Sequence, residues 1–426
     1  MSRKVSLGAA VSVAAIAAAV AVSLTYRYSM GKFNAKVADV NERQAMYTKL
    51  SEIDQKARQD YVGKIDESAL TDGICAGYLA GLGDSHAQYL SPKKYRAYLN
   101  ATDDRNIGVG IQTVRDSDGN MEIIEVTKGS PAEKSGIKKG DTIVAVDGKD
   151  VVRSTYAVAL NMLEGSAGTK VRLKILHSQD GSATSASQTE PIEITVTRGE
   201  YRAQTVQYSM VNGNAAYIKI SRFDQNTATD FNNAVSTLIR RRAAGIVIDL
   251  RGNSGANVET AASVLDTLLP AGNTVISRGK DGRTQVEYTS HSNEVEVPLG
   301  ILINNETSGA AEIFAADIRD FKKGLLVGEK TAGNAVKTAA VPLSDGSAMI
   351  LSVADYLTAG GKDLNGAGVA ADINISLGSE QKALLERNSL SPSKDAQVQA
   401  SVSALIRQGA SVQQSPGVTS PASATG

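Results

Sequence analysis

Between residues 215 and 328, short apolar segments that favour strands alternate with longer segments of helical periodicity. The strand-like segments include GIVIDLR and PLGILIN, and the helix-like ones include NVETAASVLDTLL and GAAEIFAADIRDF. Strands that are apolar on both faces need a covering layer on each side. The alternation therefore predicts an α/β fold in which helices cover a parallel sheet.

Two polar loops follow strands of this predicted sheet. They are residues 251–256 (RGNSGA) and 304–309 (NNETSG). Parallel sheets carry their functional groups in the loops beyond the carboxyl ends of the strands. We therefore expect the functional site there, and we interpret Asp249 and Glu312, which flank these loops as isolated carboxylates, as structural.

The segment before the sheet has a different periodicity. From Asn106 the pattern becomes strand-like, with a turn cluster at 116–120 and a short helix at Pro131–Ser135. Residues 105–199 close off a unit of about 95 residues, which is a plausible size for an independent domain. The sequence thus predicts a multi-domain α/β protein.

The remaining segments complete the predicted domain order. Residues 31–104 have helical spacing, and residues 200–408 hold the alternating core together with a last helix from Lys394 to Gln408. Residues 409–426 are rich in Ser, Pro and Ala and are predicted to be a disordered tail.

The N-terminus contains an uncharged run. Arg3 and Lys4 precede Val5–Leu24, whose roughly 20 residues could span about 30 Å as a helix. We expect residues 1–30 to be a membrane anchor, with a single pass through the cell membrane and the bulk of the chain extracytoplasmic. The alternative is a cleaved signal peptide with Ala19–Ala21 as its small-residue site.

Composition limits the partners and cofactors. Lys plus Arg and Asp plus Glu number 45 each, which argues against a nucleic-acid partner. Cys75 is the only cysteine, so no intrachain disulfide is possible. No cluster has metal-ligand spacing, and we expect neither a metal nor another cofactor. The N-terminal helices could mediate homo-oligomerisation.

Several motifs in order resemble the carboxy-terminal processing (tail-specific) serine peptidases. They are GLGDSHAQYLSPKKY, NIGVGI, GSPAEKSGIKKGDTIVAVDG, YIKISRFDQNTATDF, GIVIDLRGNSGA, VGEKTAG and LSVADYLTAGGKDLNGAGVAADI. The resemblance extends from about Leu50 to Gln408. It implies a PDZ domain at 105–199, β-sandwich-like with short helices, inserted between the N-terminal helical region and a peptidase-like core.

The resemblance also implies a partner. The PDZ domains of this family bind polypeptide C-terminal tails by adding a strand to a sheet edge. Ile107, Gly108 and Val109 are the residues expected to bind the tail. Asn106 stands where the family has a glycine, and a purely structural PDZ domain is the alternative interpretation.

The catalytic positions depart from the family pattern. The family uses a serine nucleophile and a lysine base, and that lysine accepts a proton only when burial lowers its pKa. Here Gly309 stands at the nucleophile position, Asn334 at the base position and Thr338 at a family glutamine. This predicts a degenerate site in a member of a serine peptidase family. The alternative function is an inactive pseudopeptidase that binds tails as an adaptor.

A displaced catalytic pair is a further hypothesis. Ser308 and Lys337 are the candidate catalytic residues, with Lys330 as a second possible base. Gly255 and Gly309 are the candidate oxyanion donors. The alternative is that Ser308 caps a helix at residues 309–321 and that Lys337 is a solvated strand residue.

Overall fold

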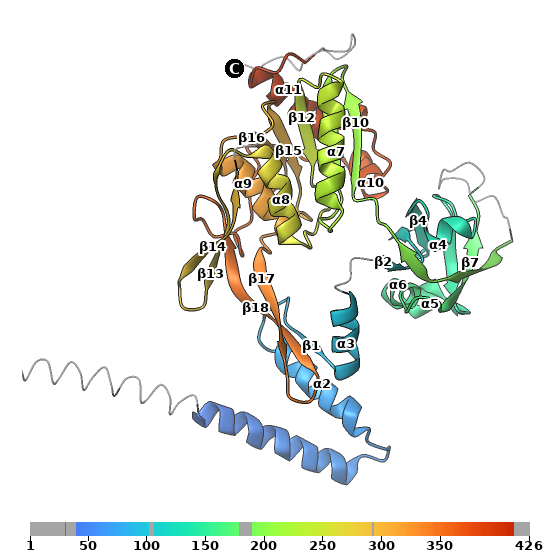
Figure 1. Ribbon diagram of the computed structural model, residues 1–426. Helices are drawn as coiled ribbons and strands as arrows, with labels where there is room; N and C mark the ends of the chain where they lie inside the picture. The colour runs from blue at the N-terminus through green and yellow to red at the C-terminus, as the bar shows by residue number, and fades with distance from the viewer. Residues whose placement is uncertain (1–29, 31–39, 102–105, 179–189, 292–293, 413–426) are drawn as a thin grey trace, which may run out of the picture. The chain divides into compact units, whose positions relative to one another are not determined.

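The computed structural model describes residues 30, 40–101, 106–178, 190–291 and 294–412 (Figure 1). The chain divides into two units, residues 1–77 and 78–426, and each is described by itself. In the first unit, residues 40–60 are helical and α2 (Glu67–Ala80) begins. The Arg58 guanidinium donates to both carboxylate oxygens of Glu67, at 2.6 and 2.8 Å.

The expected membrane anchor is corrected by the structure. Among the described residues, no helix is both long enough and apolar enough to cross a bilayer. The helix at 40–60 is largely exposed and carries charged side chains along its length, such as Glu52, Asp54 and Arg58. The predicted run itself, Val5–Leu24, lies outside the described residues.

The predicted parallel sheet is confirmed in the second unit. Its strands lie in the order β10 (Val206–Val211), β11 (Ala215–Ile220), β12 (Gly245–Asp249), β15 (Leu299–Ile303), β16 (Gly324–Gly328) and β19 (Ile373–Asn374). Only β10 runs antiparallel to its neighbour. The central strands β12 and β15 are buried along their whole length, as their continuous apolar sequence predicts.

Helices cover both faces of this sheet (Figure 1). Ile246 and Ile248 of β12 pack in one cluster with α7 (Thr227–Arg240), α8 (Val258–Leu268) and α9 (Ala310–Asp320). Val247, between them, packs in a second cluster with α11 (Ala396–Arg407). Successive strand side chains point to opposite faces, so one apolar strand contributes to two layers.

A second sheet is antiparallel, and several of its strands are interspersed along the chain with those of the parallel sheet. The sequence patterns did not predict this sheet. Its strands are β1 (Gln88–Leu90), β13 (Gly272–Gly279), β14 (Thr284–Ser290), β17 (Val336–Pro342) and β18 (Ala348–Leu357). Asp84 attaches the segment before β1 to this sheet, since its carboxylate accepts from the Ser352 backbone N–H and hydroxyl, each at 3.0 Å.

The segment expected to be a PDZ domain is a small β-structure with short helices. Its strands are β2 (Asn106–Gly108), β3 (Ile111–Arg115), β4 (Met121–Val126), β5 (Thr142–Val146), β6 (Lys149–Asp150), β7 (Lys170–Leu176), β8 (Ile192–Thr197) and β9 (Gly199–Tyr201). Its helices are α4 (Pro131–Lys134), α5 (Val151–Ser154) and α6 (Tyr156–Leu163). Fully buried Met121, Ile123 and Ile143 belong to its core.

Three further elements complete the described chain. They are α3 (Pro92–Ala101), α10 (Ser379–Glu386) and the 3-10 helix η1 (Pro392–Lys394). The predicted last helix begins at Ala396, because Asp395 caps it by accepting from the Gln397 and Val398 N–H groups. Of the predicted disordered tail, only 409–412 are described, and Ala410 packs in the cluster around α11.

Candidate active site

Three loops that leave neighbouring strands β12, β15 and β16 are joined by hydrogen bonds. The Ser308 N–H donates to the Asn253 C=O at 3.0 Å, and the Ala332 N–H donates to the Thr307 C=O at 3.0 Å. The buried Thr307 hydroxyl also donates to the Leu250 C=O at 2.9 Å. The parallel sheet therefore brings together the two loops singled out in the sequence and adds a third, residues 329–335.

Gly309 occupies a sharp turn between β15 and α9. It is the N-cap residue of α9, with φ of 57° and ψ of −124°, a region that side chains rarely adopt. A Cβ added there would lie 3.4 Å from the Ser254 carbonyl oxygen, so space for a side chain exists. Hydrolases commonly hold a serine nucleophile on such a strained strand-to-helix turn. Here the turn is kept without a side chain.

Glu312 fastens this turn to the third loop. Its buried Oε1 accepts from the Thr331 hydroxyl at 2.5 Å and from the Gly333 N–H at 2.6 Å. Its Oε2 accepts from the N–H groups of Gly309 at 3.1 Å and Asn334 at 2.8 Å. One carboxylate oxygen thus bridges the two positions that carry the nucleophile and the base in the family pattern. The sequence could have predicted the contact between Glu312 and the Gly309 N–H, because Glu at the third helical position is typical of a capping box.

Ser308 lies half-buried at this turn but does not cap the helix. The structure corrects that interpretation, since Gly309 is the N-cap and α9 spans Ala310–Asp320. The Ser308 C=O accepts from the Ala311 N–H at 3.2 Å. Among the described residues, no hydrogen bond connects the Ser308 hydroxyl with a lysine ammonium.

Lys337 is part of the antiparallel sheet and has a carboxylate partner. Its Nζ lies 2.7 Å from Oε1 of Glu287 on β14, and 39% of its side chain is exposed. Burial of Glu287 opposes ionisation, but the hydrogen bonds from Lys337 and Ser277 and the Lys337 charge outweigh it and lower the pKa of Glu287. An ammonium held by a carboxylate and partly solvated lacks the desolvation that activates a lysine base.

Replacing Lys337 with glutamine is expected to reduce the free energy of unfolding by about 0.5–1 kcal/mol at neutral pH. Because the folded-state pKa of Glu287 is lowered, the pair stabilises the protein above the ordinary glutamate pKa of about 4.3. This contribution disappears as pH falls through the folded-state pKa. Urea unfolding at pH 7 and pH 3.5 measures it, with exposed Lys330→Gln as the control. If the free energies of unfolding of wild type and Lys337→Gln differed by the same amount at both pH values, the ion pair would be contradicted.

Asn334, Lys330 and Thr338 are exposed. The position of Asn334 is fixed through its backbone N–H, which donates to Glu312, and not through a buried side chain. Glu312 therefore orders the loop at residues 329–335. The Asn334 side chain, at the position where the family pattern has a lysine, faces solvent.

The candidate oxyanion donors already have acceptors within the protein. The Gly255 N–H donates to Oδ1 of Asn253 at 2.8 Å, and the Gly309 N–H donates to Glu312. Gly255 has φ of 88°, and a Cβ there would lie 2.7 Å from the Ala310 nitrogen. Only glycine allows the loop after β12 to approach the Gly309 turn so closely.

A buried ionic network supports the start of the same loop. The Arg251 guanidinium donates to Asp249 at 2.5 and 2.8 Å, to Asp395 at 2.7 Å and to Gln397 at 2.8 Å. Burial would raise the pKa of Asp249, but the Arg251 charge and hydrogen bonds lower it. The network joins β12 to the start of α11, and no local sequence pattern signals it because Arg251 and Asp395 are 144 positions apart.

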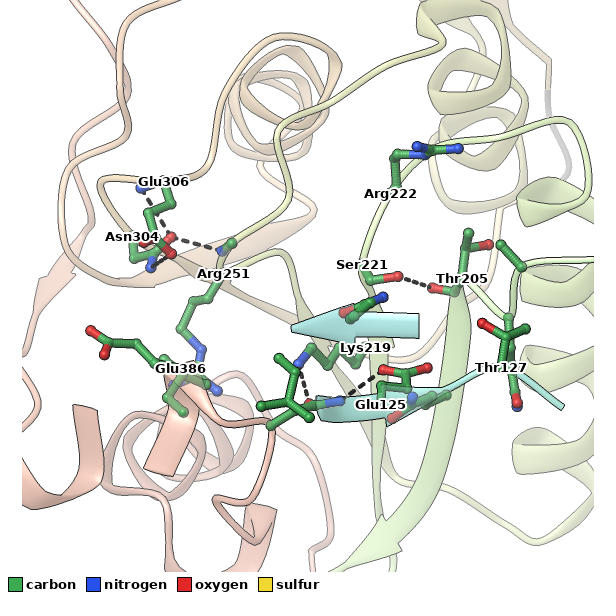
Figure 2. A pocket seen from close by; sticks show the side chains of 18 of the residues that line it. Glu125, Thr127, Thr205, Lys219, Ser221, Arg222, Arg251, Asn304, Glu306 and Glu386 are labelled. Atoms are coloured by element: carbon green, nitrogen blue, oxygen red, sulfur yellow. Dashed lines mark hydrogen bonds between the residues drawn. The ribbon is translucent and has the colours of Figure 1, made fainter. Parts of the chain in front are cut away.

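A cavity of about 530 Å³ opens beside this loop (Figure 2). Arg251, Asn304 and Glu306 line it from the strand ends, Lys219 lines it from β11 and Glu125 lines it from β4. Within the second unit, the Asn388 side chain accepts from the Lys219 ammonium at 2.7 Å and donates to Glu125 at 3.1 Å. The lining mixes polar and apolar side chains and carries both signs of charge. Within the described chain no cluster of three His, Cys, Asp or Glu could hold a metal.

The residues predicted to bind a tail lie at the entry to the small domain. Ile107 and Gly108 belong to β2, which pairs along one edge with β9. The Val109 C=O accepts from the Ala132 N–H at 2.9 Å. The next strand, β3, is the outermost strand of the five-strand path β3-β4-β5-β7-β8 and pairs with β4 only, so it offers an edge for strand addition.

Family models match two segments of the chain. Residues 214–375 match peptidase family S41, and residues 122–176 match the PDZ domain. The first segment contains the five parallel strands with their strand-end loops, and the second contains nearly all of β4 together with β5, β6 and β7 of the small domain. The two matches therefore coincide with the two architectures described above.

Relatives in sequence and structure extend the match to most of the chain. The carboxy-terminal processing protease CtpA of Bacillus subtilis is 30% identical over 366 residues, covering 85% of this chain and 75% of that protein. The carboxyl-terminal-processing peptidase 1 of Arabidopsis thaliana chloroplasts is 30% identical, covering 79% and 69%. The solved photosystem II D1 C-terminal processing protease aligns with a TM-score of 0.51 and 28% identity, covering 80% and 92%. The chain therefore belongs to the carboxy-terminal processing peptidases of peptidase family S41 and contains the PDZ domain typical of them.

Proposed function

We propose that this protein binds the C-terminal tails of polypeptides through its PDZ domain and does not hydrolyse them. The observation that carries the proposal is the Gly309 turn. It keeps the strained backbone of a nucleophile position, yet no hydroxyl is attached to it, and the neighbouring base position carries Asn334. An amide side chain cannot accept a proton as a neutral lysine does.

The displaced pair is poorly arranged for the same chemistry. Hydrolysis requires a hydroxyl and a base within about 2.6–3.2 Å of each other. Lys337 is ion-paired with Glu287 in the antiparallel sheet, and the Ser308 hydroxyl lies on the turn held by Asn253 and Ala311. The engagement of Lys337 by a carboxylate supports a site without a serine–lysine dyad.

Two features support a binding role. β3 pairs with β4 only, so its other edge can accept an added strand. Main-chain hydrogen bonds give this kind of recognition much of its affinity. The cavity beside the strand-end loops has the size of a ligand site and is lined by apolar side chains as well as by groups of both charges. Both features remain although the catalytic side chains are replaced.

Incubation with an unfolded reporter protein that ends in a free apolar C-terminus tests the proposal. We expect no cleavage by the wild type or by Ser308→Ala, whereas an active relative of the family cleaves the same reporter in a parallel reaction. Both proteins should bind a labelled tail peptide equally, and amidation of the peptide carboxylate should weaken binding several-fold. Cleavage by the wild type that Ser308→Ala abolishes would overturn the proposal and establish a displaced nucleophile.

The double variant Gly309→Ser, Asn334→Lys tests whether the scaffold is still catalytic. The space around Gly309 admits a Cβ, although the backbone conformation costs about 1–3 kcal/mol with a side chain. Gain of cleavage in this variant alone would attribute inactivity of the wild type to these two positions. If the wild type cleaved the reporter as fast as the double variant, the proposal that the wild type does not hydrolyse tails would be wrong.

A further inference from the structure

The open edge of β3 is partly occupied by a side chain of the same domain. Tyr156 is the first residue of α6, and its hydroxyl donates to the Thr113 C=O at 2.8 Å. The phenol has one proton, so the Thr113 hydroxyl, also at 2.8 Å, donates in return to the phenolic oxygen. Two hydrogen bonds therefore connect α6 with the middle of β3.

The carbonyl that Tyr156 uses belongs to the edge that a ligand strand needs. β3 pairs with β4 on one side, where Thr113 lies opposite Ile123. The main-chain groups of Ile123 bond to Gly140 and Asp141 instead, each at 2.8 Å, so the Thr113 carbonyl faces the unpaired side of β3. An added strand must hydrogen-bond the main-chain groups on the other side, with its backbone nitrogen about 2.9 Å from such a carbonyl. The phenolic oxygen of Tyr156 already lies 2.8 Å from the Thr113 carbonyl oxygen, about the distance that the ligand nitrogen would need.

The turn before α6 fixes Tyr156 in this direction. Thr155 has φ of 74° and ψ of 145°, a conformation that is strained for a β-branched residue, and it makes no side-chain cap to α6. Tyr156 also packs against the buried core of the domain. Its ring is therefore held from two sides.

We propose that Tyr156 is an autoinhibitory latch on the PDZ domain, which a C-terminal tail displaces from the Thr113 carbonyl when it binds as an added strand. The proposal rests on the tail-binding function above and specifies its regulation. Tail affinity is then set by competition between the phenol and the main chain of the ligand, so that removing the hydroxyl tightens binding.

Fluorescence anisotropy with a labelled octapeptide that ends in Val-Ala-Val and a free carboxylate tests the latch. Tyr156→Phe keeps the ring and removes the competing hydrogen bonds, and we expect its Kd to fall about three- to tenfold. Thr113→Val removes one of the two bonds and should give a smaller decrease. Tyr208→Phe, an exposed tyrosine on β10, is the matched control and should leave Kd unchanged. An unchanged or higher Kd in Tyr156→Phe would overturn the latch.

Hydrogen exchange without peptide separates failure of the latch from failure of tail binding. If the latch exists, Tyr156→Phe increases amide exchange in 111–115 and 156–163 and leaves β7 and β8 protected, whether or not a peptide binds. If Tyr156→Phe exchanges faster but no variant binds the peptide, the proposed tail-binding function is rejected, and the contact between Tyr156 and Thr113 is still supported. Unchanged exchange would reject the latch even if all variants bind peptide.

Discussion

Arg251→Met lowers the free energy of unfolding by about 3–5 kcal/mol, the expected cost of removing one partner from a buried ionic network. The methionine fills similar volume, but Asp249 and Asp395 lose the guanidinium that both contact, and their side chains are 0% and 2% exposed. Urea unfolding followed by circular dichroism measures the loss. Arg240→Met, on the exposed end of α7, is the matched control and should change stability by less than about 0.5 kcal/mol.

The deficit of Arg251→Met should also depend on pH. In the wild type, Arg251 lowers the pKa of Asp249, so the carboxylate stabilises the fold above the ordinary aspartate pKa of about 3.9. Without the cation, burial raises the pKa of Asp249, and the folded variant keeps a proton that the unfolded chain has released. Its stability therefore falls as pH rises, and the deficit should be larger at pH 8 than at pH 5. An equal deficit at both would contradict an electrostatic origin.

Glu312→Gln is the second substitution with a large expected effect, a loss of at least about 2 kcal/mol. Both carboxylate oxygens accept two hydrogen bonds each, and all four donors lie in the Gly309 turn or the third loop. An amide has one oxygen, so in either orientation its NH₂ group faces two donors. Thermal and urea unfolding measure the loss, and Glu296→Gln, on an exposed loop, is the control.

A local measurement distinguishes the bridge from general stabilisation. If Glu312 holds the third loop to the Gly309 turn, exchange of the amides in 329–335 should accelerate more than exchange in β12 or β15. Uniform acceleration through the core would show that Glu312 acts only on global stability. Wild-type exchange in 329–335 would contradict the bridge.

Local patterns predicted the parts of this protein that depend on neighbouring residues in sequence. The period of apolar residues identified the strands and helices of the parallel sheet, and the glycine and proline turns identified the small domain. The two polar loops that the sequence singled out as candidate functional loops lie together in the structure, because carboxyl ends of parallel strands share one edge of a sheet. The antiparallel sheet of β1, β13, β14, β17 and β18 was not predicted, since its strands come from distant segments.

The sequence by itself determined which chemistry positions 309 and 334 can carry, because a glycine has no hydroxyl and an asparagine has no amine in any fold. Tertiary structure decided how the remaining side chains are used. Lys337 pairs with Glu287 across 50 positions, Arg251 with Asp395 across 144, and Tyr156 with Thr113 across 43. Such partners leave no periodic signal, since an ion pair or hydrogen bond depends on distance in space and not on spacing along the chain.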